Sequence, residues 1–441
     1  MIDDGRPRPA STSGGRDVDA TGVAAFHLLA KPTGATCNLD CEYCFFLSKE
    51  MLYPGSRFRM ADELLETYIR EVIAAQRVPY VSIAWQGGEP TMMGASFFRR
   101  SIELVEKHRR PGMQVEYTIQ TNGTLIDDEL AELFREHHFL VGISIDGPAA
   151  MHDTYRVDKG GRPTHERVLR GLEILQRHGV EYNTMTTLHH ANADHPLEVY
   201  RFLRDDCSSL FMQFIPMIER LPAPRIDVPL AELGLTPGRR LDAPWRSWRD
   251  RPLYRQQGAL VTDRSITPEQ YGSFLIGVFD EWVKRDIGEV FVQMFDVTLA
   301  NWAGEPPTLC IHSETCGTAL ALEHNGDLYS CDHFVEEDYR LGNITETPMA
   351  ELVASEQQRR FGQAKRDTLP AYCRGCDVLR ACHGGCPKDR FIETPDGEPG
   401  LNYLCAGYQA FFRHVDRPMA EMTDLLRRGL PPSLISRRPA G

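Results

Sequence analysis

The chain has 441 residues, of which 42% are hydrophobic and 25% are charged, and its formal net charge is −13. This composition is typical of a globular protein and excludes a mainly disordered or fibrous chain, while the length predicts two or three domains. The acidic balance argues against a general nucleic-acid binder, which usually presents a basic face, and no apolar run approaches the roughly 20 residues that span a bilayer.

The first 23 residues are rich in glycine, serine, proline and charged side chains. They lack the apolar core of a secretory signal peptide, so we expect a disordered lead and a cytoplasmic protein with no membrane partner.

Short apolar segments alternate with amphipathic ones between residues 24 and 218, which predicts an α/β domain. Strands are predicted at 25–30, 81–85, 115–119, 141–145, 182–188 and 211–215. Helices are predicted between them at 61–76, 96–108, 127–137, 165–179 and 196–206, where apolar residues recur at three- and four-residue spacing. Six successive βα units predict a parallel sheet wound as a partial (β/α)6 or a full barrel, with ligands at the C-terminal ends of its strands.

Residues 219–300 are expected to connect this domain to the rest of the chain. Six prolines and nine arginines lie between Arg220 and Arg264 with little periodicity, so a plain linker and a substrate-facing loop are equally compatible with this segment. A helix is predicted at 267–287, where Thr267 and Pro268 form a typical helix start.

Twelve cysteines are unusual in a cytoplasmic chain, where reducing conditions disfavour disulfides. They occupy positions 37, 41, 44, 207, 310, 316, 331, 373, 376, 382, 386 and 405. Metal, cluster or redox chemistry is the better interpretation of this pattern. Cys207 stands apart from the others, and we interpret it as a buried or incidental thiol.

Cys37, Cys41 and Cys44 form a C-x₃-C-x₂-C run shortly after the first predicted strand. A [4Fe–4S] cluster normally has four cysteine ligands, so three would leave one iron open for an exchangeable ligand, as in catalytic metal sites generally. A zinc site with a distant fourth ligand is the structural alternative.

This run resembles the signature of the radical S-adenosylmethionine (SAM) enzymes, and the turn Gly87-Gly88-Glu89-Pro90 strengthens the resemblance. In that family the open iron binds the methionine moiety of SAM, and one electron from the cluster releases a 5′-deoxyadenosyl radical. The glycines permit a close backbone approach, and Glu89 can pair with the ammonium group. The resemblance also implies that five further residues contact SAM: Tyr43, Gln120, Asn122, Ser144 and Arg156. For each of them, an ordinary capping or surface role is the alternative.

The last third of the chain carries eight cysteines, and its C-x₂-C-x₅-C-x₃-C run resembles the SPASM domain of peptide-modifying radical SAM enzymes. We expect this small Cys-rich domain at 301–416, followed by a peripheral tail at 417–441. The resemblance implies two auxiliary [4Fe–4S] clusters, which would carry electrons because full ligation leaves no open iron. The two ligand sets would be interleaved along the chain. One set would be Cys310, Cys316, Cys331 and Cys386, and the other would be Cys373, Cys376, Cys382 and Cys405. Two zinc sites are the alternative.

Within this group the sequence resembles the anaerobic sulfatase-maturating enzymes. The resemblance runs from about residue 24 to about 416 and is carried by segments 25–41, 212–216, 293–296, 329–335 and 340–344. It implies oxidation of a cysteine or serine in a sulfatase polypeptide to Cα-formylglycine. The adenosyl radical removes a hydrogen atom from Cβ, a base takes the thiol or hydroxyl proton, and the remaining electron leaves. It also implies a one-electron donor such as flavodoxin or ferredoxin.

Two other functions stay open from the sequence. A maturase that forms thioether or carbon–carbon cross-links in a ribosomal peptide would use the same scaffold, although many such enzymes carry an additional N-terminal peptide-binding domain. A non-catalytic electron-transfer or zinc scaffold would not need the three-cysteine run together with the Gly-Gly-Glu-Pro turn.

Two aspartates are candidates for the base, although either could be an ordinary surface carboxylate. Asp332 directly follows the cysteine at 331, which would fix its backbone near an electron acceptor, and it resembles the proton acceptor of the maturases. Asp296 is expected to shape the pocket or the peptide path. We therefore predict that Asp332 is the proton acceptor.

Overall fold

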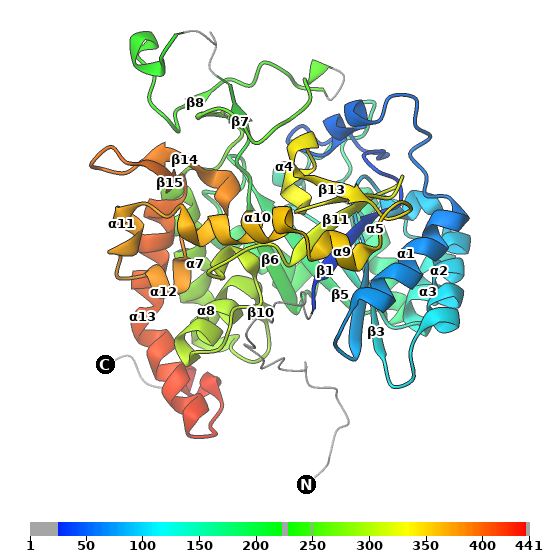
Figure 1. Ribbon diagram of the computed structural model, residues 1–441. Coiled ribbons are helices and arrows are strands. Elements are labelled where there is room, and N and C mark those ends of the chain that lie inside the picture. Colours follow the sequence, from blue (N-terminus) through cyan, green and yellow to red (C-terminus); the bar gives the residue numbers. More distant parts are fainter. Residues whose placement is uncertain (1–24, 223–227, 248–249, 438–441) are drawn as a thin grey trace.

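The computed structural model describes residues 25–222, 228–247 and 250–437, and its centre is a ten-stranded sheet (Figure 1). Six parallel strands form most of it: β1 (His27–Lys31), β2 (Tyr80–Trp85), β3 (Gln114–Thr121), β4 (Phe139–Ser144), β5 (Tyr182–Leu188) and β6 (Phe211–Pro216). Each pairs with its neighbour in chain order. The predicted partial barrel is confirmed, and every predicted strand overlaps an observed one. The expected N-terminal lead at 1–23 lies outside the described residues.

Helices connect the parallel strands, and the spacing of apolar residues predicted all of them except the short helix at 149–152. They are α1 (Asp62–Ala75), α2 (Ala95–His108), α3 (Asp128–Glu136), α4 (Ala149–His152), α5 (His165–His178) and α6 (Pro196–Arg201). The helix predicted at 196–206 is α-helical only to Arg201 and continues as a wider π turn to Asp206.

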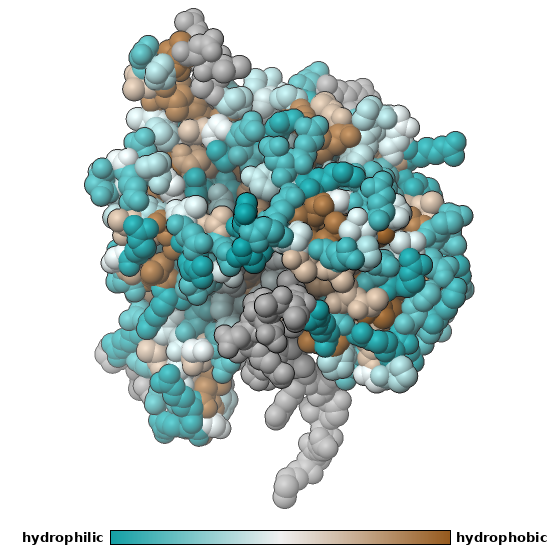
Figure 2. All heavy atoms as spheres, in the orientation of Figure 1, coloured by the Kyte–Doolittle hydropathy of each residue, from teal (hydrophilic) through white to brown (hydrophobic). Residues whose placement is uncertain are grey.

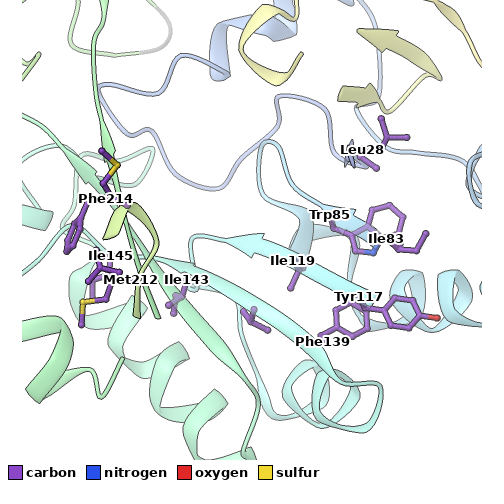
Figure 3. Close-up of a cluster of buried hydrophobic side chains, with 14 of the residues drawn as sticks. Leu28, Ile83, Trp85, Tyr117, Ile119, Phe139, Ile143, Ile145, Met212 and Phe214 are labelled. Carbon is purple, nitrogen blue, oxygen red and sulfur yellow. The ribbon is translucent and has the colours of Figure 1, made fainter. Parts of the chain in front are cut away.

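The core of the barrel lies between the strands and these helices. Burial alternates along the strands because successive side chains point to opposite faces of a sheet. Ile83, Trp85 and Ile119 are buried on the face that packs against the helices (Figure 3). Gln120 and Ser144, which are only partly buried, alternate with these positions and face the barrel interior. The apolar face therefore holds the barrel together, and the polar face is left for a ligand.

The sheet continues beyond the six strands at both edges. At one edge β10 (Phe291–Val292) pairs in parallel with β6 and leads into α8 (Gln293–Ala303). At the other edge β11 (Ala319–Glu323) pairs in parallel with β1, and β12 (Asp327–Tyr329) and β13 (Arg340–Asn343) follow in antiparallel order. Main-chain pairing thus joins the cysteine-rich region directly to the barrel.

Further helices and a hairpin pack around both edges of the sheet (Figure 1). They are α7 (Pro268–Arg285), α9 (Met349–Val353), α10 (Glu356–Asp367), α11 (Ala371–Arg374), α12 (Leu379–Cys382), α13 (Cys405–Arg427), β14 (Arg390–Glu393) and β15 (Pro399–Asn402). The expectation of a peripheral tail from residue 417 is wrong for its first part. Residue 417 lies inside α13, whose Met419 and Met422 are fully buried, because the amphipathic pattern of this helix continues past the predicted boundary.

The described residues of the segment at 219–265 include a small three-stranded sheet. Its strands are β7 (Arg220–Leu221), β8 (Arg240–Leu241) and β9 (Leu260–Thr262), with β9 in the middle. Figure 1 shows this insertion above the barrel, on the side where the parallel strands end. Buried Glu219 organises it, since its carboxylate accepts hydrogen bonds from Trp245, Thr262 and Arg264.

Across the described residues, no helix combines the length and the apolar character needed to cross a membrane. The face shown in Figure 2 is mostly hydrophilic, with apolar side chains in small separate patches.

Candidate active site

The three-cysteine loop follows β1 and is fixed by main-chain hydrogen bonds to a second loop. Asp40 N donates to Val157 O at 2.8 Å, and Glu42 N donates to Tyr155 O at 2.9 Å. The thiol of Cys37 accepts a hydrogen bond from Leu39 N at 3.3 Å. These contacts hold the loop at the C-terminal ends of the strands, where parallel sheets bind ligands.

The thiols of this loop are in surroundings that disfavour their ionisation unless a positively charged group binds them. Burial raises the pKa of Cys37, and it raises the pKa of Cys41 to about 12 despite the nearby charge of Arg156. Thiols become metal ligands only when they lose their protons, so a positive charge must compensate them here. Three thiols on one short loop fit the metal cluster that the sequence predicts.

The Gly87–Gly88 turn lies directly against this loop. Gly87 and Gly88 have φ angles of +82° and +47°, in the left-handed region that favours glycine. A Cβ at Gly88 would lie 2.0 Å from Thr36 O, and one at Gly87 would lie 2.5 Å from the Lys31 side chain. Both glycines are therefore needed for the backbone of this turn to reach the end of β1 and the cysteine loop.

Glu89 joins the ends of β2 and β3. Its Oε1 accepts hydrogen bonds from the Thr91 hydroxyl at 2.6 Å and the Thr121 hydroxyl at 2.7 Å, and its Oε2 accepts one from Asn122 N at 2.8 Å. The side chain is fully buried. Burial raises the pKa of Glu89, although these hydrogen bonds act to lower it. The carboxylate orders this edge of the sheet, while its pairing with an ammonium group stays a prediction.

Asp146, at the end of β4, is the centre of a buried polar network that the sequence analysis did not single out. Its carboxylate accepts hydrogen bonds from the Tyr43 hydroxyl at 2.5 Å, Arg156 Nε at 2.8 Å and Thr187 N at 2.9 Å. Burial alone would raise the pKa of Asp146, but the Arg156 guanidinium and His189 hold it well below its usual range. The only sequence signal was its place in the polar turn after a strand.

The other predicted SAM contacts lie along the same edge. Gln120 Nε2 donates to the Ser144 hydroxyl at 3.0 Å, which links the ends of β3 and β4. Asn122 Nδ2 donates to Asn38 Oδ1 at 2.8 Å and lies 3.6 Å from the Cys37 sulfur. The structure thus brings the predicted residues into one continuous polar edge around the cysteine loop.

The two candidate bases differ in their surroundings. Asp332 forms an ion pair with Lys31, the last residue of β1. Burial would raise the pKa of Asp332, but the charge of Lys31 lowers it below the ordinary value. Asp296, in the first turn of α8, has an exposed side chain, and partial desolvation by the surrounding protein raises its pKa to about 7.

Two cavities in the cysteine-rich region divide the remaining thiols. One is lined by Cys373, Cys376, Cys382 and Cys405. The other is lined by Cys310, Cys316, Cys331 and Cys386. These are the two interleaved sets that the resemblance implied, and four thiols around one hollow match the four cysteine ligands of an iron–sulfur cluster. In the described part of the chain, no three Cys, His, Asp or Glu side chains gather closely enough to hold a single metal ion.

The insertion at 219–265 contacts the cysteine loop. The sequence analysis left open whether this segment is a plain linker or a substrate-facing loop. Arg251 is only 2% exposed and donates hydrogen bonds to the carbonyl oxygens of Glu42 and Cys44. Tyr254 O accepts a hydrogen bond from Lys49 Nζ at 2.6 Å. The segment is therefore packed against the site and is not a plain linker.

Comparison with known proteins agrees with this geometry. Residues 32–203 match the model of the radical SAM superfamily, and residues 310–377 match that of an iron–sulfur cluster-binding domain, SPASM. A serine-type anaerobic sulfatase-maturating enzyme of Bacteroides thetaiotaomicron is 46% identical over 88% of this chain and 89% of its own length. A cysteine-type anaerobic sulfatase-maturating enzyme of Clostridium perfringens is 31% identical over 88% of this chain and 95% of its own.

A solved structure described as native anSMEcpe with bound AdoMet and Cp18Cys peptide has the same fold. It superimposes with a TM-score of 0.75 at 30% identity, covering 91% of this chain and 99% of that one. The similarity spans the barrel and the cysteine-rich region together.

Replacement of Gly88 by alanine tests the packing of the turn on the cysteine loop. Because the new Cβ would collide with Thr36 O, we expect Gly88→Ala to displace the loop and to lower its iron content after anaerobic reconstitution. Overpacking of this kind typically costs about 1–3 kcal/mol. Gly94→Ala is the matched control, since Gly94 has a φ of +78° but open space around its Cβ position. Equal iron contents in the two variants would contradict this account.

Proposed function

The chain belongs to the anaerobic sulfatase-maturating enzymes of the radical SAM superfamily, and we propose that it oxidises a serine of a sulfatase polypeptide to Cα-formylglycine. The observation that carries the serine assignment is the 46% identity to the serine-type enzyme, against 31% to the cysteine-type enzyme over an equal share of the chain. As a member of this family, the chain is an oxidoreductase that uses SAM and iron–sulfur clusters.

We propose three [4Fe–4S] clusters, which would use every cysteine except Cys207. Cys37, Cys41 and Cys44 would hold the cluster that binds SAM, and the two four-cysteine cavities would hold the auxiliary clusters. Together the bound groups supply a radical that removes a hydrogen atom from the substrate Cβ and an acceptor for the electron that remains. The division of the thiols into one loop and two cavities supports this count, and Cys207 is fully buried among apolar residues.

The polar edge of the barrel would bind and orient SAM. Backbone groups of Gly87 and Gly88 are free to approach a ligand closely, because neither residue has a side chain. Arg156 keeps a positive charge at this edge while Asp146 holds its position, which suits the SAM carboxylate. The remaining predicted contacts would surround the nucleoside and the methionine ammonium: Tyr43, Glu89, Gln120, Asn122 and Ser144.

We propose Asp332 as the group that takes the hydroxyl proton. Its carboxylate is ion-paired with Lys31, at the end of the strand from which the three-cysteine loop leaves, and it directly follows Cys331, which lines one of the four-cysteine cavities. Lys31 lowers the pKa of Asp332, so the carboxylate is ionised and can accept a proton. Asp296 would shape the pocket or the peptide path, since its side chain is exposed in the first turn of α8.

The substrate would enter as an extended segment between the barrel edge and the insertion at 219–265. The contact of Arg251 with the cysteine loop supports this path, because it places the insertion over the reacting edge. We further propose a small one-electron donor, such as flavodoxin or ferredoxin, as the reductant, and the cytoplasm as the compartment. The oxidation-sensitive thiols of the cluster sites support a reducing compartment.

The cluster assignment predicts a stepwise loss of iron. With three clusters, the reconstituted chain should hold about twelve iron atoms, and the triple variant of Cys37, Cys41 and Cys44 to alanine about eight. The triple variant should form no 5′-deoxyadenosine from SAM and dithionite, because no open iron remains. Cys207→Ala is the control and should keep full iron. Loss of all iron in the triple variant would contradict three independent sites.

The serine assignment predicts a preference between two peptides that differ in one atom. We expect a sulfatase-type peptide with serine at the reacting position to give formylglycine with a higher kcat/KM than the same peptide with cysteine. Mass spectrometry after hydrazine labelling measures the product, because an aldehyde reacts with hydrazine and a cross-link does not. A clear preference for cysteine would overturn the serine assignment, and an unlabelled product would favour a cross-linking maturase.

The base assignment predicts unequal effects of two isosteric changes. Loss of a general base typically costs about 10²–10⁴-fold in rate, so Asp332→Asn should nearly stop formylglycine formation while SAM cleavage continues. Asp296→Asn should reduce turnover less. The base must be ionised, and the pKa of Asp332 is lowered whereas that of Asp296 is about 7, so wild-type kcat/KM should stay level as the pH drops through about 7. A near-normal rate in Asp332→Asn with an inactive Asp296→Asn would transfer the role to Asp296.

A further inference from the structure

One short loop carries a cysteine of each four-cysteine cavity. Cys382 lines one cavity and Cys386 lines the other, with only His383, Gly384 and Gly385 between them. These three residues have φ angles of +43°, +71° and +60°. A run of left-handed residues is unusual, above all for His383, and persists only where surrounding contacts enforce it. We call residues 382–386 the shared loop.

Arg390 supplies those contacts from the start of β14. Its Nε donates to Gly384 O at 2.9 Å, and its Nη2 donates to His383 O at 2.7 Å and to Gly385 O at 3.4 Å. Its Nη1 donates to Lys365 O at 2.5 Å. All three nitrogens of one guanidinium are therefore used, and three of the four acceptors belong to the shared loop. Such a planar fork of donors is specific to arginine.

The backbone of the shared loop lies close to this guanidinium. A Cβ at Gly384 would lie 2.7 Å from Arg390 Nη2, so the glycine is required for the approach. From another side Asn402 Nδ2 donates to Gly384 O and to Cys386 O, both at 3.2 Å. The shared loop is thus held between Asn402 and Arg390.

The position of Arg390 also brings it near thiols of both cavities. Burial lowers its pKa, while Cys373 and Cys382 of one set and Cys316 and Cys386 of the other act on it in the opposite direction. Lys365 offers a contrast. Its Nζ donates to carbonyl oxygens of the 310–313 segment, and the thiols that act on it, Cys310, Cys316 and Cys386, all belong to one set.

We propose that Arg390 is a positioning residue shared by the two auxiliary sites, which fixes the shared loop and places one positive charge between the two clusters. This inference rests on the clusters of the proposed function but not on its substrate. A fixed positive charge favours the reduced, more negative state of a cluster, and cluster potentials depend on local charge and hydrogen bonding. Arg390 therefore raises both reduction potentials, and Lys365 raises one.

The test uses the chain in which Cys37, Cys41 and Cys44 are replaced by alanine, so that only auxiliary clusters remain. Arg390→Gln removes the charge, Arg390→Lys keeps it, and Lys365→Met is the matched control that affects one site. Arg428→Gln, an exposed arginine at the end of α13, controls for net charge. The measurements are iron content and the midpoint potentials from redox titrations followed by electron paramagnetic resonance.

We expect Arg390→Gln to lower both potentials, Arg390→Lys to lower them less because it keeps the charge but not the planar fork of donors, and Lys365→Met to lower one. Loss of iron from both sites together in Arg390→Gln would also support the proposal, provided that in the full chain the three-cysteine cluster still responds to SAM. An effect of Arg390→Gln on one site alone, or two unchanged potentials, would overturn it. Neither readout involves a peptide, so failure of this proposal and failure of the serine assignment are distinguishable.

Discussion

The parallel pairing of β1 with β11 is the constraint on which the arrangement of this molecule depends. The register from His27 opposite Ala319 to Lys31 opposite Glu323 places the end of β1 beside the start of the cysteine-rich region. The three-cysteine loop leaves from one of these strands, and the hairpin that leads to Cys331 and Asp332 leaves from the other. The ion pair of Lys31 with Asp332 follows from this pairing. A change of register by one residue would turn these side chains to opposite faces.

Buried cations around the cysteine sites stand in contrast to the net charge of −13. Arg251, Lys365 and Arg390 all donate hydrogen bonds to carbonyl oxygens of segments that carry cysteines. A carbonyl oxygen satisfies a buried guanidinium or ammonium without neutralising it, so the positive charge remains available to nearby thiolates. The negative net charge and the cationic surroundings of the thiols are therefore separate features, and the overall composition shows only the first.

The sequence predicted the parts of this structure that local patterns determine. Strand alternation and helical spacing located the six βα units, and the spacing of Cys37, Cys41 and Cys44 located the loop after β1. Patterns of this kind do not record pairing between distant segments, so the addition of β11 to the barrel sheet was missed. The same limit applies to Asp146 and Arg390, whose importance depends on partners that only the folded chain brings together. The tail boundary failed because α13 continues past a change in composition.

The two candidate carboxylates lie beyond opposite edges of the six-stranded barrel. Asp296 follows β10, which extends the sheet beyond β6, whereas Asp332 follows β12, which extends it beyond β1. The three-cysteine loop leaves the end of β1, and the ion pair of Lys31 with Asp332 joins that end to the β12 side of the sheet. Asp332 also directly follows Cys331, which lines a four-cysteine cavity. A proton acceptor at this position would lie next to the acceptor of the electron, so the proton and the electron of one substrate carbon would leave in the same direction. Separation of charge in a low-dielectric interior is costly, and this arrangement avoids it.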